Sequence, residues 1–236
     1  MKLRTRVVLQ LAALFLALGA SALAQNAYLY VVHAVPGRDL ADNLNPQLPV
    51  DVLIDGKTCV THSLTFGNTS APYTLAAGTY TVQISLANTL APCTNTAVLD
   101  SQVTLTPGQS IAAVAAISST QPVLLLFTEN LVPVAPGNAR FVLVNSADAP
   151  ALQATLTQLD VKTPQTFTGS ANPGAQTFIP VPAGVYLVQI AETGSSNVLT
   201  SETITLADQS VTFGYASGES LNNTVELVNR TVRDVF

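Results

Sequence analysis

The sequence predicts an all-β protein built from two tandem antiparallel Greek-key, immunoglobulin-like β-sandwich domains, and three observations carry that prediction. One stretch is written twice: Tyr73 to Ile84 returns as Ile179 to Ile190, with the Ala-Gly, Tyr and Val-Gln-Ile positions in register. Thr, Val, Ile and Tyr alternate with other residues in short runs, and after the first residues no long stretch repeats apolar positions at helical spacing. Turn pairs such as Asp55-Gly56 and Ala77-Gly78 separate the runs, as they do in sandwiches.

The repeat extends to whole domains. Asn26 to Val32 opens the first unit as Asn138 to Val144 opens the second, which indicates a duplicated domain and not a duplicated hairpin. We therefore expect one sandwich over residues 25–131, a Pro-rich linker over 132–137 and a second sandwich over 138–236. Two prolines restrict the linker, so we expect a semi-rigid connection.

Each unit holds eight expected strands, each of them a short run rich in β-branched or aromatic residues between turn-forming residues. In the first unit they lie near residues 27–33, 50–54, 63–66, 73–75, 79–86, 97–105, 110–117 and 123–128. In the second unit they lie near residues 139–144, 152–159, 165–167, 177–181, 184–191, 199–206, 210–216 and 224–228.

Residues 1–24 have the three parts of a signal peptide. Three basic residues precede the apolar stretch Val7 to Leu18, and Ala22-Leu23-Ala24 forms a small-residue cleavage site. The apolar stretch is shorter than the roughly 20 residues of a membrane helix. We expect cleavage before Gln25 and a secreted or periplasmic protein without a transmembrane anchor.

Charge excludes some partners. After cleavage six basic residues face fourteen acidic ones, which gives a net charge of −8. Such a surface repels nucleic acid and anionic membranes. The expected partner is therefore an envelope or extracellular protein or polysaccharide of unknown identity.

Cys59 and Cys93 are the two cysteines of the chain. Export carries both into an oxidising compartment, so we expect a disulfide between them, worth about 4 kcal/mol by the chain-entropy model. A metal or redox role has no support, because no C-x-x-C motif is present and no histidine stands beside either thiol.

His33 and Asp51 are the residues that best match a base and its orienting acid. The repeat places Asn145 and Gln153 at the equivalent positions, where that proton chemistry is lost. We therefore expect a structural polar pair that hydrogen-bonds between neighbouring strands, and no catalytic residue or cofactor. A secreted hydrolase using His33 and Asp51 is the alternative, although the sequence offers it no G-x-S-x-G or H-E-x-x-H motif.

The segment Gly37 to Gln47 is an insertion without a counterpart in the second unit. Its oxygen-bearing residues Asp39, Asp42, Asn43 and Asn45 are candidate calcium ligands, but their spacing does not fit an EF-hand. We expect a plain solvated loop, with a calcium- or carbohydrate-binding module centred on the insertion as an alternative.

Tyr80 and Tyr186 each follow Ala-Gly and lead into a strand. This placement is typical of a tyrosine corner, in which the hydroxyl group bonds to nearby backbone. Carbohydrate stacking is the alternative, and the absence of tryptophan weakens it.

Several motifs of the first unit resemble the bacterial secreted family catalogued as domain of unknown function 4397 (DUF4397). The matching stretches are Val31-Val32-His33-Ala34, Leu48 to Gly56, Ala77-Gly78-Thr79-Tyr80 and Val103-Thr104-Leu105. Members of that family typically run V-V-H-A-S-P-D-A-P-x-V-D-V-Y-V-D-G and are often tandem, so the resemblance implies two copies, a sandwich fold and an envelope or extracellular location. It implies no activity and no functional residues. We expect an exported, non-catalytic interaction or structural protein.

Overall fold

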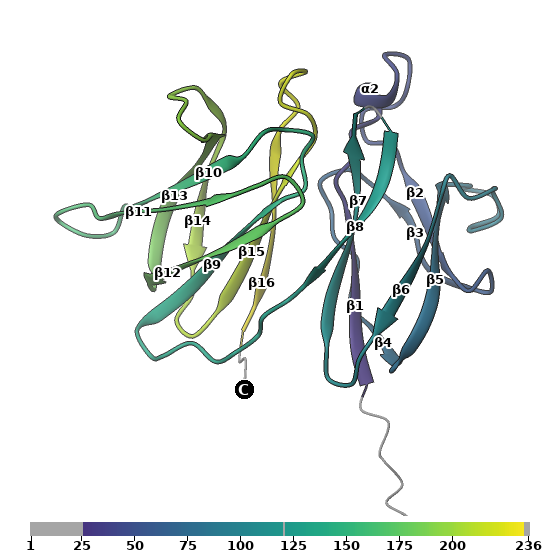
Figure 1. Cartoon of the computed structure of the whole chain (residues 1–236), viewed down its shortest axis with the longest axis horizontal. Helices are drawn as coiled ribbons and strands as arrows, with labels where there is room; N and C mark the ends of the chain where they lie inside the picture. Colours follow the sequence, from purple (N-terminus) through teal and green to yellow (C-terminus); the bar gives the residue numbers. More distant parts are fainter. Residues whose placement is uncertain (1–25, 120, 234–236) are drawn as a thin grey trace, which may run out of the picture.

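The computed structural model describes residues 26–119 and 121–233 and confirms the predicted all-β class (Figure 1). Its strands form four four-stranded sheets, and α2 (Gly37–Leu40) is a single helical turn. The expected signal peptide, residues 1–24, lies outside the described residues. Over the part of the chain that is described, no helix has the length and apolar character to cross a membrane.

The first unit is a sandwich of the sheets β4-β1-β7-β8 and β3-β2-β5-β6. The chain changes sheet after β1, β3, β4 and β6. The strands are β1 (Asn26–His33), β2 (Val50–Ile54), β3 (Thr58–Leu64), β4 (Tyr73–Ala76), β5 (Gly78–Leu86), β6 (Leu99–Leu105), β7 (Ser110–Ser118) and β8 (Gln121–Thr128).

The second unit repeats this topology with the sheets β12-β9-β15-β16 and β11-β10-β13-β14. Its strands follow each other in the same order between the two sheets, as a duplicated unit requires. They are β9 (Asn138–Asn145), β10 (Leu152–Gln158), β11 (Thr166–Ala171), β12 (Gln176–Pro182), β13 (Gly184–Glu192), β14 (Val198–Leu206), β15 (Val211–Ser217) and β16 (Glu226–Val232).

Two details differ from the sequence-based expectation. β1 pairs with β7 in parallel, and β9 pairs with β15 in the same way, so the sheets are not antiparallel throughout. The two strands of each pair are not joined by a hairpin, which would make them antiparallel. The chain passes through the other sheet between them, so they can run parallel. In addition, β3 begins at Thr58, earlier than the expected strand near Ser63. Asp55 and Gly56 both adopt positive φ (52° and 62°), the backbone of a tight hairpin turn that returns the chain at once beside β2.

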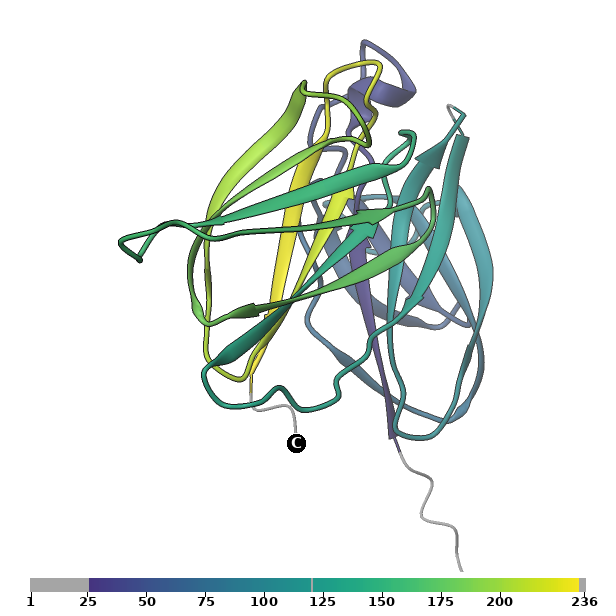
Figure 2. The same ribbon diagram turned by 60° about the vertical axis from the view of Figure 1, so that its left-hand side comes forward.

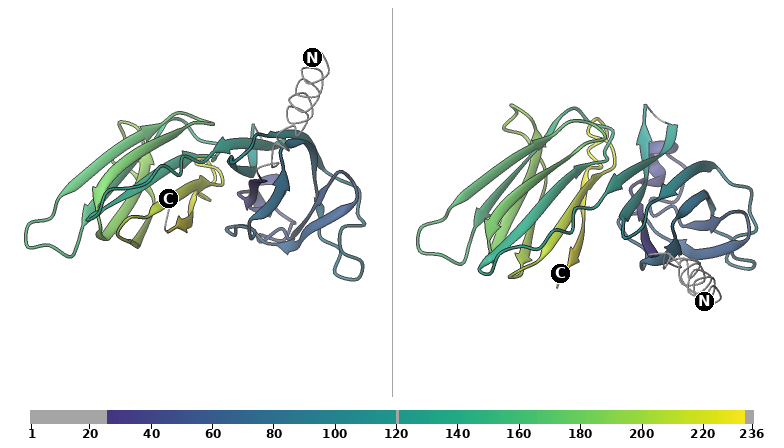
Figure 3. Two further views of the ribbon diagram at one scale, coloured as in Figure 1. Left: turned by 90° about the horizontal axis from the view of Figure 1, so that it is seen from below. Right: turned by 60° about the horizontal axis from the view of Figure 1, so that its bottom comes forward.

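Three hydrophobic cores hold the strands together. One core lies inside each sandwich, and the third lies between them, where β1, β7 and β8 face β9, β15 and β16. Alternate residues of one strand serve different cores, since Val31 packs into the first sandwich and Val32 into the shared core. The molecule is thus a stack of four sheet layers, and its two halves stand side by side in Figures 1 and 3, while in the turned view of Figure 2 the second half partly covers the first.

Candidate functional site

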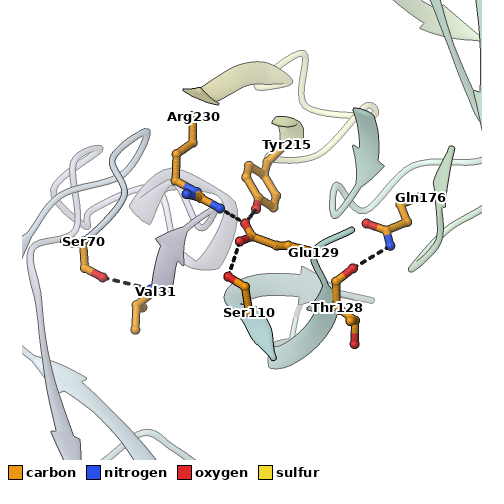
Figure 4. Close-up of polar contacts among 8 residues, drawn as sticks. All are labelled: Val31, Ser70, Ser110, Thr128, Glu129, Gln176, Tyr215 and Arg230. Atoms are coloured by element: carbon orange, nitrogen blue, oxygen red, sulfur yellow. Dashed lines mark hydrogen bonds and ion pairs between the residues drawn. The ribbon is translucent and has the colours of Figure 1, made fainter. Parts of the chain in front are cut away.

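A buried charge network lies at the third core. Glu129 directly follows β8, and its side chain is 0% exposed. One carboxylate oxygen accepts a hydrogen bond from Ser110 Oγ (2.6 Å), and the other accepts from Tyr215 Oη (3.1 Å) and forms an ion pair with Arg230 (Figure 4). Ser110 belongs to the first unit, whereas Tyr215 and Arg230 belong to the second. The carboxylate therefore joins the two sandwiches.

Arg230 lies against two aromatic rings. Its guanidinium carbon lies 3.7 Å from the centroid of Tyr30, in the first unit, and 5.3 Å from that of Phe213, in the second. Burial lowers the pKa of Arg230, and the neighbouring Tyr30 opposes that shift. Burial also raises the pKa of Tyr215, so its phenol keeps the proton that it donates to Glu129.

Polar contacts fix the interface beside the connector between the units. Gln176 Nε2 donates to the carbonyl oxygen of Thr128 (2.9 Å; Figure 4), and Arg140 Nη1 donates to the carbonyl oxygens of Asn130 (3.3 Å) and Val132 (3.2 Å). The connector is therefore held by side chains of the second unit in addition to its own prolines.

Backbone groups meet at the opposite end of the interface. The N–H of Gly218 donates to Ala34 O (3.1 Å), and the N–H of Ser119 donates to Asp148 Oδ2 (2.6 Å). Gly218 has φ of +91°, and a Cβ atom there would lie 2.4 Å from the carbonyl oxygen of Thr224. Only glycine fits this crossing point.

The insertion Gly37 to Gln47 is not a plain solvated loop, and that expectation is wrong. Leu40 and Leu44 pack against the first core, and the buried carboxylate of Asp39 accepts a hydrogen bond from Thr224 Oγ1 of the second unit (2.6 Å). Leu40 ends the helical turn and Leu44 lies in the loop after it, and both are partly buried against the first core. The insertion is thus part of the interface, next to the loop that follows β15 (Figure 2).

The calcium candidates of the insertion do not converge. Asn45 Oδ1 accepts from the N–H of Gln47, while Asp39 and Asp42 line an open hollow with Asn222 and Thr224. Among the residues that the structure describes, no group of three His, Cys, Asp or Glu side chains is arranged to hold a metal ion.

Glu219 is hydrogen-bonded to Asn222, which lines this hollow, and its pKa is raised. Burial raises its pKa, and the nearby carboxylates of Asp39 and Asp148 raise it further. Asn222 donates to Glu219 (2.5 Å) and opposes the shift.

His33 and Asp51 do not bond to each other, so the expected direct pair is wrong. His33 Nε2 donates to Leu48 O (2.7 Å), and its Nδ1 accepts from the N–H of Val35 (3.3 Å). Burial lowers the pKa of His33, which keeps the ring neutral in this arrangement. The two residues stay apart because β1 and β2 belong to opposite sheets.

Asp51 instead binds backbone N–H groups. Its carboxylate accepts from the N–H groups of Ser63 (2.9 Å), Asn88 (3.1 Å) and Cys93 (2.8 Å). Burial alone would raise the pKa of Asp51, but these three donors outweigh it and hold the pKa below its usual value, with a weaker contribution from His62. The carboxylate fastens the loop between β5 and β6 to β2.

The repeat counterparts of this pair are also apart. Asn145 Nδ2 donates to the carbonyl oxygens of Pro150 (3.0 Å) and Ala171 (3.2 Å), whereas Gln153 stands opposite Ala191 on the neighbouring strand. In both units the polar side chain at the end of the first strand therefore bonds to backbone.

The disulfide between Cys59 and Cys93 is present, with a Cα–Cα distance of 5.8 Å. It ties β3 to the loop that Asp51 also holds. The hydroxyl groups of Tyr80 and Tyr186 donate to the carbonyl oxygens of Ala76 (2.9 Å) and Pro182 (2.8 Å), four residues upstream in both units. This is the contact that a tyrosine corner makes.

Sequence reasoning missed the interface residues Glu129, Arg230 and Tyr215. The signal was the apolar run of β7, where Ile111 to Ile117 is buried at every position; β15 is also buried from Val211 to Ser217, but its sequence includes Thr212 and Ser217. A strand with one solvated face alternates, whereas an unbroken apolar run indicates burial on both faces.

Fold and interface define a class: an all-β protein of two sandwiches with a shared core and a disulfide in the first. The family described as Domain of unknown function (DUF4397) matches residues 27–155, which span the first sandwich and reach into β10. The chain belongs to this family, as the motifs of the first unit indicate. The match does not reach past β10, so a second family copy stays a prediction.

Solved structures offer further, distant similarities. The Bacillus anthracis TIE protein is 13% identical over 83% of this chain, which spans 32% of that protein, with a TM-score of 0.24. The family 41 carbohydrate-binding modules of streptococcal virulence factors, which recognise α-glucan, give 12% identity over 84% of this chain and 96% of that one, with a TM-score of 0.27. A candidate adhesin of Bacteroides ovatus gives 12% identity over 75% of each chain, with a TM-score of 0.21. These scores carry no inference about ligands, and no curated protein matches the sequence.

Proposed function

We propose that this is an exported, non-catalytic interaction protein of the bacterial envelope or extracellular space, which acts through the surface of a rigid two-sandwich body. The shared core with its Glu129–Arg230 ion pair carries the proposal. Burying an ion pair between two domains fixes their relative orientation, and a fixed orientation matters when a partner contacts both.

The chemistry of the hydrolase candidates supports a non-catalytic role. Both nitrogens of His33 and both carboxylate oxygens of Asp51 are engaged by backbone groups. A general base needs a lone pair within reach of its substrate; both ring nitrogens of His33 are occupied, and Asp51 is fully buried. Export itself is supported by the disulfide, since such bonds persist in oxidising compartments.

A neutral polysaccharide is the second candidate partner, and one row of side chains favours it. Hydroxyl and amide groups stand in register across the outer sheet of the second unit, where Thr168 faces Thr155, Thr155 faces Gln189 and Gln189 faces Ser201. An uncharged row of donors and acceptors suits sugar hydroxyl groups better than it suits a charged protein surface.

The test is to immobilise residues 25–236 and to measure retention of envelope fractions and of neutral glycans on an array. We expect saturable retention of a defined component. For a glycan, Gln189→Ala should reduce retention, whereas Gln83→Ala, its repeat counterpart in the first unit, should not.

The hydrolase alternative is tested in parallel with ester, peptide and glycoside substrates. We expect no turnover above the buffer rate. Turnover that His33→Asn abolishes, in a variant with unchanged circular dichroism, would replace the proposed function with a hydrolase.

A further inference from the structure

The first sandwich contains an apolar cavity of about 200 Å³ at the end where α2 lies. Leu40 and Leu44 of the insertion line it together with Leu48, which directly follows the insertion, and Leu86 and Val98 also line it. The cavity lies between the two sheets of the sandwich, close to the ends of β1, β5 and β7, and it opens to solvent.

The lining leaves no polar group free for a ligand. The exposed surface of the cavity is entirely apolar. His33 contributes its ring, but both ring nitrogens are engaged, by Leu48 O and by the N–H of Val35. A sugar, a peptide backbone or a charged ligand would therefore lose its hydrogen bonds to water without replacement, which excludes these classes.

The second sandwich lacks the leucine wall of this cavity. β9 reaches β10 through residues 146–151, whereas β1 reaches β2 through residues 34–49, so the wall of leucines has no counterpart. Glu192 also stands at the repeat position of Leu86, as each is paired with the first residue of the facing strand, Leu152 or Val50. The same end of the second sandwich is an open acidic hollow that includes Asp148 and Glu219.

We infer that the cavity of the first sandwich binds the short alkyl or aryl group of a small apolar molecule that diffuses in water. An apolar cavity of roughly 150 Å³ stays dry and takes up benzene, and this one is larger. A free molecule is favoured over a bilayer lipid, because the surplus of acidic residues on the mature chain disfavours approach to an anionic membrane. This ligand site goes beyond the proposed surface function and does not depend on it.

The test uses n-alkanols from butanol to decanol, titrated into ¹⁵N-labelled mature chain and followed by NMR. Each added methylene should tighten binding roughly fourfold until the cavity is full. The amides that shift should lie around Leu44, Leu86 and Ala115, with no counterpart in the second sandwich.

Two variants localise the site. Leu86 is 43% exposed, so the Leu86→Glu variant should fold. It places at the mouth of the cavity the glutamate that the second unit has at the equivalent position, Glu192. Octanol binding should fall at least tenfold in that variant. Leu90→Glu makes the same change four residues further along, in the loop that follows β5, at a residue that is 95% exposed and outside the cavity lining, so binding should be unchanged.

Three outcomes would overturn the inference. They are no saturable binding of any alkanol, equal binding by the Leu86→Glu variant, and capture by phosphatidylcholine vesicles without binding of free alkanol. Because the envelope-retention assay detects the surface function separately, failure here leaves the proposed function standing.

Discussion

Removing the cation of the interface network should destabilise the whole chain. In Arg230→Met an aliphatic side chain remains beside Tyr30 and Phe213, but the carboxylate of Glu129, which is 0% exposed, loses its counter-charge. An uncompensated buried charge costs about 3–5 kcal/mol, and the lost stacking on Tyr30 adds about 0.5–2 kcal/mol. We expect the free energy of unfolding to fall by at least about 3 kcal/mol.

The assay is urea denaturation followed by far-ultraviolet circular dichroism. Glu129→Gln keeps the shape of the side chain and removes the charge, so the double variant Glu129→Gln/Arg230→Met no longer buries an unpaired ion. Its loss should be smaller than the sum of the two single losses by about 1–3 kcal/mol. Additive losses, or a loss below about 1 kcal/mol for Arg230→Met alone, would refute a buried, coupled pair.

Three further predictions concern the first sandwich. Replacing Cys59 and Cys93 with serine should lower the free energy of unfolding by about 4 kcal/mol, measured in urea against the oxidised parent; an unchanged midpoint contradicts this. Asp51→Asn should cost about 2–4 kcal/mol at pH 7, because three backbone donors lose a charged acceptor. Since the pKa of Asp51 is lowered, its contribution is present above the usual value of 3.8 and is lost as the pH falls, so the gap between variant and parent should narrow in acid. Below pH 6.5 the His33→Asn variant should lose less stability than the parent. Because the pKa of His33 is lowered in the folded chain, the unfolded parent takes up a proton first as the pH falls, which favours unfolding. Parallel curves of unfolding free energy against pH for variant and parent would argue against this.

The alternating strands and their turns could be predicted from the sequence because each strand has a core-facing side. Val50 and Val52 point into the first core and Asp51 points away from it, which is the period-two pattern of a sandwich. The disulfide could also be predicted, because an exported chain enters an oxidising compartment and each of its two cysteines has only the other to pair with. The start of β3 could not be placed, although Asp55-Gly56 was identified as a turn, because the mixed polar residues after it do not alternate.

The shared core could not be placed because it depends on which sheets meet. The continuous apolar run of β7 indicates a second buried face but does not identify the strand that covers it. Glu129 and Arg230 lie far apart in the sequence and become partners only when β8 and β16 face each other. The insertion was misjudged for the same reason, since Thr224, which holds Asp39, belongs to the other unit.

Differential scanning calorimetry of residues 25–236 tests most directly whether the shared core makes the two sandwiches one body. We predict a single transition whose van't Hoff enthalpy equals the calorimetric enthalpy of the whole chain. Two separable transitions, or a van't Hoff enthalpy near half of the calorimetric value, would show two independent domains and contradict the account.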